Sequence, residues 1–169
     1  MDHKQKERQQ RGEDFQNELR RSWRRVNNCW RMRIADGRGG TRPADEVILL
    51  NDINVLGEHK RTQGDRFELS FLRVNQLTGL VDFDQVIERN KGLVFVSFLD
   101  DAKGLDAAVT FRLIDILGHM KQRGRQYVTL AEFRTKEIPG LILPRKQLED
   151  GPGYDLKGVN DYFVTDKCK

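Results

Sequence analysis

Residues 43–60 read Pro-Ala-Asp-Glu-Val-Ile-Leu-Leu-Asn-Asp-Ile-Asn-Val-Leu-Gly-Glu-His-Lys, and this stretch decides the expected fold. It contains two short apolar runs rich in β-branched residues, 47–50 and 53–56, on either side of the polar pair 51–52. Two apolar runs around a two-residue polar turn are typical of a β-hairpin. The stretch therefore predicts two antiparallel strands.

The charged residues of this stretch lie at the ends of the predicted strands. Asp45 is expected to open the first strand and Glu58 to close the second. Because side chains alternate between the two faces of a strand, Glu58 and Lys60 should point the same way and His59 the opposite way. Two carboxylates and one ammonium group are thus expected to meet at one end of a sheet.

Phosphodiester hydrolysis is a reaction for which this group of side chains is suited. Carboxylate oxygens bind a hard cation such as Mg²⁺, which keeps several waters when only one or two carboxylates hold it. A bound dication acidifies water and polarises a phosphoryl oxygen, and Lys60 could orient or deprotonate that water or offset charge on the phosphate. The alternative is structural, since an acid-x-Lys pattern is also common at the solvated end of a strand. The preceding Asp45, at hairpin distance, favours the metal-dependent interpretation.

The composition indicates a globular protein with one domain. The chain has 169 residues, of which 37% are hydrophobic and 33% charged, and this length suits a single domain with its own core. No segment has the length of a membrane span and the first residues lack the apolar stretch of a signal peptide, so a cytoplasmic protein is expected. Cys29 and Cys168 are too few for a disulfide framework or a zinc site and are expected to be free thiols.

Positive charge is concentrated at the N-terminal end of the chain. Residues 1–42 contain 12 Lys and Arg against 6 Asp and Glu, whereas residues 43–169 contain 18 against 20. Neutralisation of phosphates dominates nucleic-acid affinity, and arginine binds phosphate in bidentate fashion. The residues expected to bind DNA are Arg20, Arg21, Arg24, Arg25, Arg38 and Arg42. A solvated helix face is the alternative for such a run of charges.

The remaining elements are predicted from periodicity. Residues 1–11 are expected to be a flexible basic N-terminus, followed from Gly12 by an amphipathic helix and then by a Gly-rich loop, 36–43. The other expected elements are strands over 29–35, 92–99, 107–113 and 138–144, helices over 67–80, 114–121 and 130–133, and a polar tail from Gln147. We therefore expect a single α/β domain over residues 12–169, with a central mixed sheet flanked by helices.

One glutamine occupies an apolar position of its predicted helix. Gln76 falls on the same stripe as Leu69, Leu72 and Leu80, at spacings of three and four residues. An unpaired buried amide is costly, so Gln76 is expected to have partners. These are either structural hydrogen-bond partners or the water and phosphate groups of a metal site.

The order of these elements resembles the PD-(D/E)xK nuclease superfamily, whose core is the restriction-endonuclease-like fold. Within it the sequence is most similar to the RecU-type Holliday-junction resolvases and their shorter phage-type relatives, over residues 12–144. The family's Asp and Glu-x-Lys fall on Asp45, Glu58 and Lys60 with the same separation, and its glutamine falls on Gln76.

The resemblance implies a metal-dependent, structure-selective DNA endonuclease that resolves four-way junctions in recombination. It implies a homodimer that acts in a bacterial or phage-infected cell. It also implies that Asp45, Glu58 and the backbone carbonyl of His59 bind Mg²⁺ or Mn²⁺, and that Asp45, Glu58, Lys60 and Gln76 are catalytic.

Two departures from the family pattern concern the outer parts of the site. The acid expected at position 16 of the first helix is Gln16, so that ligand is either lost or supplied by Glu13 or Glu18. The insertion that the longer cellular resolvases carry before the catalytic Asp is replaced by the short stretch 36–42. We therefore expect junctions to be preferred without strict selectivity.

Two other functions stay open on the sequence. The first is a related nuclease that acts on flaps, single strands or restriction sites. The second is a non-catalytic DNA-binding recombination accessory protein that keeps the fold, for which the Gln16 departure gives support. The intact Asp45, Glu58 and Lys60 favour the nuclease.

Overall fold

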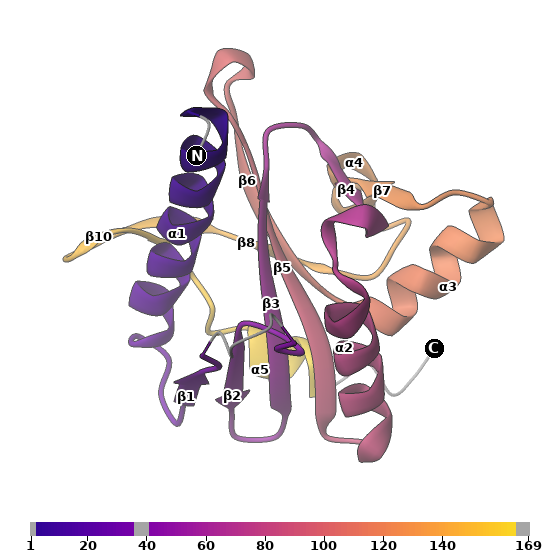
Figure 1. Cartoon of the computed structure of the whole chain (residues 1–169). Helices are drawn as coiled ribbons and strands as arrows, with labels where there is room; N and C mark the ends of the chain where they lie inside the picture. The colour runs from indigo at the N-terminus through magenta and orange to yellow at the C-terminus, as the bar shows by residue number, and fades with distance from the viewer. Residues whose placement is uncertain (1–2, 36–40, 165–169) are drawn as a thin grey trace.

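A mixed six-stranded sheet forms the centre of the computed structural model, which describes residues 3–35 and 41–164 (Figure 1). The strand order is β1-β2-β3-β5-β6-β8. The strands are β1 (Trp30–Arg33), β2 (Glu46–Leu49), β3 (Asn54–Thr62), β5 (Asn90–Asp100), β6 (Leu105–Arg112) and β8 (Leu141–Leu143). Only β3 and β5 pair in parallel, and the other neighbours in this sheet are antiparallel.

The predicted hairpin is confirmed as β2 and β3. Leu49 lies opposite Asn54, and the Leu50 amide donates to the carbonyl of Ile53 over 2.9 Å, which places the polar pair 51–52 in the turn. The expectation that the second strand ends at Glu58 is wrong. Strand β3 continues to Thr62 because it pairs along its whole length with the buried strand β5.

Helices cover both faces of the sheet, so the predicted α/β class with a central mixed sheet is confirmed (Figure 1). On one face, apolar residues of α1 (His3–Trp23) and α5 (Val159–Val164) pack in one core cluster. The other face carries α2 (Val74–Val86), α3 (Leu113–Arg123) and α4 (Leu130–Arg134). The order of first helix, antiparallel strands, second helix and central strand is the one predicted for the restriction-endonuclease-like core.

Two predicted helices begin at other residues in the structure. The first helix begins at His3 and not at Gly12, so residues that were expected to be flexible are helical. Phe67 lies in strand β4 (Arg66–Glu68), which pairs with β7 (Tyr127–Thr129), and α2 begins only at Val74 after the short 3-10 turn η1 (Leu69–Phe71). A cross-strand partner thus overrides the helical periodicity of the sequence in this segment.

The polar tail from Gln147 is also structured. Strands β9 (Arg145–Leu148) and β10 (Gly151–Tyr154) form a hairpin, and α5 follows it. The hairpin is fixed to α1 because the Tyr154 amide donates to the Ser22 hydroxyl over 2.8 Å. Tyr154 is buried in the core on this face, which is why a segment of polar sequence is ordered here.

Two smaller predictions concern cysteines and membranes. Cys29 is a free thiol in the structure, and burial raises its pKa; Cys168 lies outside the described residues. Among the described residues, no helix combines the length and hydrophobicity required to cross a membrane.

Candidate active site

Asp45 lies immediately before β2 and is held by two hydrogen bonds to β3. Its backbone amide donates to the carbonyl of Gly57 over 3.0 Å, and its carboxylate oxygen Oδ2 accepts from the backbone amide of His59 over 2.8 Å. Both bonds join β2 to β3, and the side chain is buried. The carboxylate therefore has a fixed position beside Glu58.

Glu58 is buried next to it, with only 1% of its surface exposed. Its Oε1 atom lies 2.7 Å from Lys60 Nζ, which confirms that these two side chains share one face of β3. Burial, followed by the negative charge of Asp45, raises the pKa of Glu58 above its ordinary value, although Lys60 opposes the shift. The two carboxylates thus repel each other, and a cation held by both would relieve this repulsion.

Gln76 connects α2 to this pair of carboxylates. Its Nε2 donates to Glu58 Oε1 over 2.6 Å, and its Oε1 accepts from the backbone amide of Arg73 over 3.0 Å. Lys60 Nζ lies 3.4 Å from the same amide oxygen. Because the Arg73 amide can only donate, the orientation of the Gln76 amide group is fixed with its NH₂ towards Glu58. The structure thus joins Glu58, Lys60 and Gln76 in one contact group, and Asp45 lies beside this group on the neighbouring strand end.

The opposite face of β3 carries a charged network that the sequence reasoning did not identify. His59 Nε2 lies 2.8 Å from Glu46 Oε1, and Arg31 forms an ion pair with the same carboxylate. The His59 ring also contacts Phe15 of α1 and Phe95 of β5 edge-on. Burial lowers the pKa of His59, but the charge and hydrogen bond of Glu46, together with the charges of Asp45 and Glu58, outweigh burial, so the net pKa is raised. The one available signal was Glu46 itself, a charged residue at an inward-facing position of an apolar strand.

The donor set fits a hard dication with few protein ligands. Glu58 Oε2 is buried and has no hydrogen-bond partner among the described residues, so it is an acceptor that lacks a donor or a metal. No group of three or more His, Cys, Asp and Glu side chains suited to a metal exists in the described part of the chain. Two carboxylates are enough for Mg²⁺, which retains waters and binds substrate phosphate oxygens. The predicted role of the His59 backbone carbonyl as a ligand stays a prediction.

The acids of α1 do not join this group. Glu18 lies on the α1 face of the sheet, where its carboxylate binds Arg61 over 2.5 Å, Arg145 over 2.9 Å and the hydroxyl of Tyr154 over 3.1 Å. This buried cluster joins α1 to β3 and to the C-terminal hairpin. Glu13 accepts a hydrogen bond from the exposed side chain of Gln9. Neither residue contacts Asp45 or Glu58 in the described structure.

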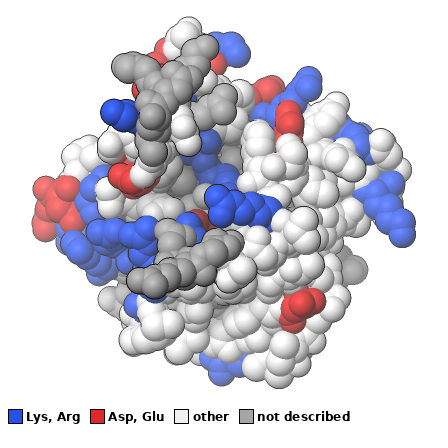
Figure 2. All heavy atoms as spheres, in the orientation of Figure 1, with Lys and Arg blue, Asp and Glu red and all other residues white. Residues whose placement is uncertain are grey.

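Three of the predicted DNA-binding arginines, Arg21 at the end of α1 and Arg24 and Arg25 just after it, lie beside the β9–β10 hairpin. Arg21 donates to the carbonyl of Pro152 over 2.9 Å, Arg25 lies 3.3 Å from Asp150, and Arg24 lies 3.7 Å from the same carboxylate. Figure 2 shows basic side chains beside acidic ones at this flank, and further basic groups near the middle of the face and over α3. Exposed ion pairs of this kind contribute little to stability.

The other two arginines predicted to bind DNA precede Asp45 in the sequence. Arg42 lies with its Nη2 atom 2.8 Å from Asp45 Oδ1, so it contacts the candidate centre itself. Arg38 lies outside the described residues.

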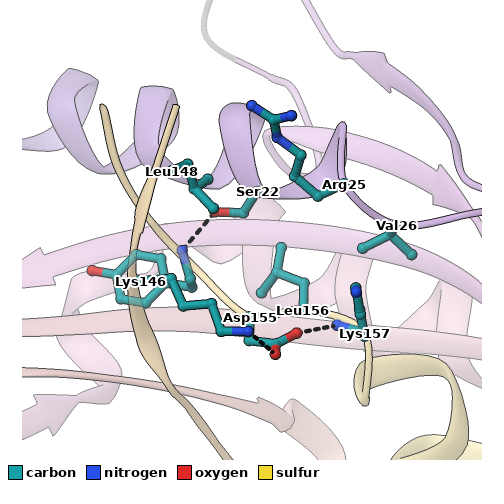
Figure 3. Close-up of a pocket in the computed structure, with 9 residues that line it drawn as sticks. Ser22, Arg25, Val26, Lys146, Leu148, Asp155, Leu156 and Lys157 are labelled. Carbon is teal, nitrogen blue, oxygen red and sulfur yellow. Dashed lines mark hydrogen bonds and ion pairs between the residues drawn. The ribbon is translucent and has the colours of Figure 1, made fainter. Parts of the chain in front are cut away.

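A cavity of about 110 Å³ lies away from the candidate centre, between α1 and the C-terminal hairpin (Figure 3). Its lining combines apolar side chains such as Val26 and Leu156 with an ion pair, Lys146 Nζ to Asp155 Oδ2 at 2.7 Å. Figure 3 shows this pair and the Ser22 hydrogen bond that fixes the hairpin. Among the described residues of the lining, the one carboxylate, Asp155, is paired with Lys146, so the cavity offers no convergent set of reactive side chains.

Comparisons with known proteins give a likeness in structure but none in sequence. No protein-family model matches the sequence, and no curated protein matches it. The matching solved structures include Hjc of Archaeoglobus fulgidus, a Holliday junction resolvase from an archaeal hyperthermophile, with a TM-score of 0.49 and 14% sequence identity. The match covers 91% of this chain and 98% of that chain. A likeness of this degree assigns no activity, so the chemistry of this chain rests on its own residues.

Proposed function

We propose that this protein is a metal-dependent DNA endonuclease of the PD-(D/E)xK type that cuts branched DNA, chiefly four-way junctions. The observation that carries the proposal is the contact group in which Gln76 and Lys60 both bind the carboxylate of Glu58, with Asp45 fixed beside it. A RecU-like resolvase of the short phage type is the family that the sequence pattern favours.

Each residue of the contact group has a distinct part in phosphodiester hydrolysis. Asp45 and Glu58 would hold Mg²⁺ or Mn²⁺, which when bound acidifies water and polarises a phosphoryl oxygen. The Lys60 ammonium group, partly exposed beside Glu58, orients the attacking water or offsets negative charge on the phosphate. Gln76 fixes the carboxylate of Glu58 through its short hydrogen bond and is thus a positioning residue.

DNA binding is assigned to the arginines at the end of α1 and just after it, and to those that precede Asp45. Arg24 and Arg25, which follow α1, pair with Glu149 and Asp150 through exposed contacts, which phosphates can replace at small cost. Arg38 and Arg42 are proposed to contact phosphates close to Asp45. Arginine forks suit such bidentate phosphate contacts.

A homodimer is the proposed assembly, because a two-fold enzyme can cut two symmetric strands of a junction. Support comes from the edge of the sheet, where Trp30 is 54% exposed, Met32 50% and Leu49 40%. Trp30 and Leu49 lie opposite each other on β1 and β2, so these apolar side chains form one patch. Exposed apolar patches of this kind mark interaction sites. A cytoplasmic location is proposed with this function.

A cleavage assay on labelled four-way junction, flap, single-stranded and linear duplex DNA tests the proposal. Cleavage of the junction in Mg²⁺ or Mn²⁺, its loss in EDTA and slower cleavage of linear duplex are expected. Faster cleavage of flaps, single strands or a defined duplex sequence would assign another nuclease activity to the same centre. DNA binding without any cleavage in either metal would instead indicate an accessory protein.

A further inference from the structure

Both oxygens of the Asp45 carboxylate already have partners within the protein. Oδ2 accepts from the His59 amide over 2.8 Å, and Oδ1 lies 2.8 Å from Arg42 Nη2. The Arg42 and Asp45 side chains are 17% and 5% exposed, so this ion pair is largely removed from water. Breaking a buried pair leaves a charge without compensation unless another charge replaces the missing partner.

Arg42 is directed to Asp45 by contacts from two elements. Its backbone carbonyl accepts from Asn75 Nδ2 of α2 over 2.5 Å, and its Nη1 lies 3.5 Å from the carbonyl of Ile34. Ile34 in turn donates its amide to the carbonyl of Asp45 over 2.8 Å. Helix α2 thus fixes the backbone of Arg42, and Ile34, which follows β1, contacts its guanidinium.

The charges of the centre are balanced within the chain. Asp45 and Glu58 contribute two negative charges, whereas Arg42 and Lys60 contribute two positive charges at contact distance. A dication held by both carboxylates would bring two further positive charges into this buried space. On Glu58, Lys60 contacts Oε1, and Oε2 has no hydrogen-bond partner among the described residues. On Asp45, the His59 amide binds Oδ2, and Arg42 contacts the remaining oxygen, Oδ1. Arg42 and the metal therefore compete for the same atom.

We propose, on the basis of the proposed nuclease function, that Arg42 is an internal counterion that competes with the metal for Asp45 Oδ1. The guanidinium leaves Asp45 when the dication binds and pairs with a substrate phosphate. DNA that captures Arg42 exposes Asp45, so DNA and metal each raise the affinity of the protein for the other, as linkage requires. The enzyme thus binds its metal tightly only when a phosphate is present.

The first test measures metal binding in the absence of DNA. Mn²⁺ is titrated calorimetrically into wild type, Arg42→Gln and the control Arg73→Gln, which removes a charge from an exposed residue whose backbone contacts Gln76. Arg42→Gln is expected to bind Mn²⁺ about tenfold tighter than wild type, which equals about 1.4 kcal/mol. The Mn²⁺ affinity of Arg73→Gln is expected to stay within about twofold of wild type, which is a difference in binding free energy well below 1 kcal/mol. Equal or weaker Mn²⁺ binding by folded Arg42→Gln, or equal tightening by both variants, would overturn the proposal.

Two further measurements separate this role from a structural one and from the nuclease activity. Arg42→Lys keeps the charge and gives a second folded variant, and its Mn²⁺ affinity is expected between wild type and Arg42→Gln. Four-way DNA should tighten Ca²⁺ binding by wild type more than by Arg42→Gln, and an equal effect on both would overturn the transfer to phosphate. Neither titration requires cleavage, so the two proposals can fail separately. If Arg42→Gln binds Mn²⁺ more tightly but the wild-type protein cuts no DNA, the counterion role of Arg42 is supported and the nuclease function is refuted.

Discussion

Gln76 Nε2 and Glu58 Oε1 lie 2.6 Å apart, so helix α2 and strand β3 meet at a carboxylate that is almost completely buried. A buried carboxylate that accepts a hydrogen bond from a neutral amide is held in one orientation without its charge being cancelled. This combination suits a metal ligand, which must be fixed and negative.

Replacing the glutamine tests whether it is a positioning residue. Gln76→Ala is expected to lower the cleavage rate by about 10- to 100-fold, as removal of groups that orient metal ligands does. Raised Mn²⁺ should recover part of the loss, because the ligand itself remains. Gln85→Ala, an exposed glutamine on the same helix, is the control and should cut normally. Gln76 would have a structural role only if the variant lost most of its soluble protein while the fraction that stayed folded cut DNA at the wild-type rate.

Removal of either carboxylate should abolish cleavage without abolishing DNA binding. Asp45→Asn and Glu58→Gln each lose a proposed metal ligand, and a metal effect of several kcal/mol corresponds to at least about a hundredfold loss of rate. Both variants also lose negative charge near the phosphate, so junction affinity in EDTA should be equal to or higher than that of wild type. The exposed Asp82→Asn variant serves as control. Near wild-type cleavage by either variant in Mg²⁺ would exclude the centre.

Lys60→Ala should lose activity in a way that metal cannot restore. The ammonium group acts on water or phosphate and is not a ligand, so a rate loss of about 10²- to 10³-fold is expected at every Mg²⁺ concentration. Lys103→Ala, which removes an exposed lysine, should have no effect. Full recovery at high Mg²⁺ would show that Lys60 only adjusts the charge of Glu58.

The hairpin and the centre could be predicted because their determinants are close together in the sequence. Glu58 and Lys60 lie on β3 and Asp45 immediately precedes the adjacent strand β2, so strand alternation predicts that Glu58 and Lys60 share a face. Gln76 followed from helical periodicity even though its helix begins later than predicted. Local pattern was therefore sufficient for the inner part of the candidate site.

The missed features depend on contacts between distant parts of the chain. Glu18 is occupied by Arg145 and Tyr154, which lie near the other end of the sequence. Tyr154 lies in the segment from Gln147, whose sequence predicts a polar tail, but α1 and the sheet bury its side chain. Phe67 has a helical sequence context but pairs with Val128 across two strands. In each case a long-range partner determines the structure, and periodicity in one segment contains no information about it.

The stability of the region around α4 should depend on pH through Glu132. This carboxylate accepts from the backbone amide and hydroxyl of Thr129 and pairs with Arg125 and His119. Burial raises its pKa, but these donors outweigh burial and lower it to about 2. The folded pKa is below the unfolded one, so the stabilisation is present above the ordinary pKa of 4.5 and is lost as pH falls towards 2. Glu132→Gln should therefore lower Tm at pH 7 and lose this difference near pH 2, whereas the exposed Glu137→Gln should change little.

The last prediction concerns the arginines of α1 and their acidic partners. If Arg20, Arg21, Arg24 and Arg25 contact phosphates, the quadruple alanine variant should bind junctions more weakly. The slope of log affinity against log salt should then become shallower by about 0.9 for each phosphate that the variant no longer neutralises.

The β9–β10 hairpin offers the converse test, because Glu149 and Asp150 compete with DNA for Arg24 and Arg25. Glu149→Gln combined with Asp150→Asn should strengthen binding more than the control pair Asp82→Asn and Asp101→Asn, which removes the same charge elsewhere. An unchanged salt slope in the quadruple variant, together with equal effects of the two acidic pairs, would show that these arginines only fasten α1 to the hairpin. The DNA would then have to be held by basic residues on the other side of the centre.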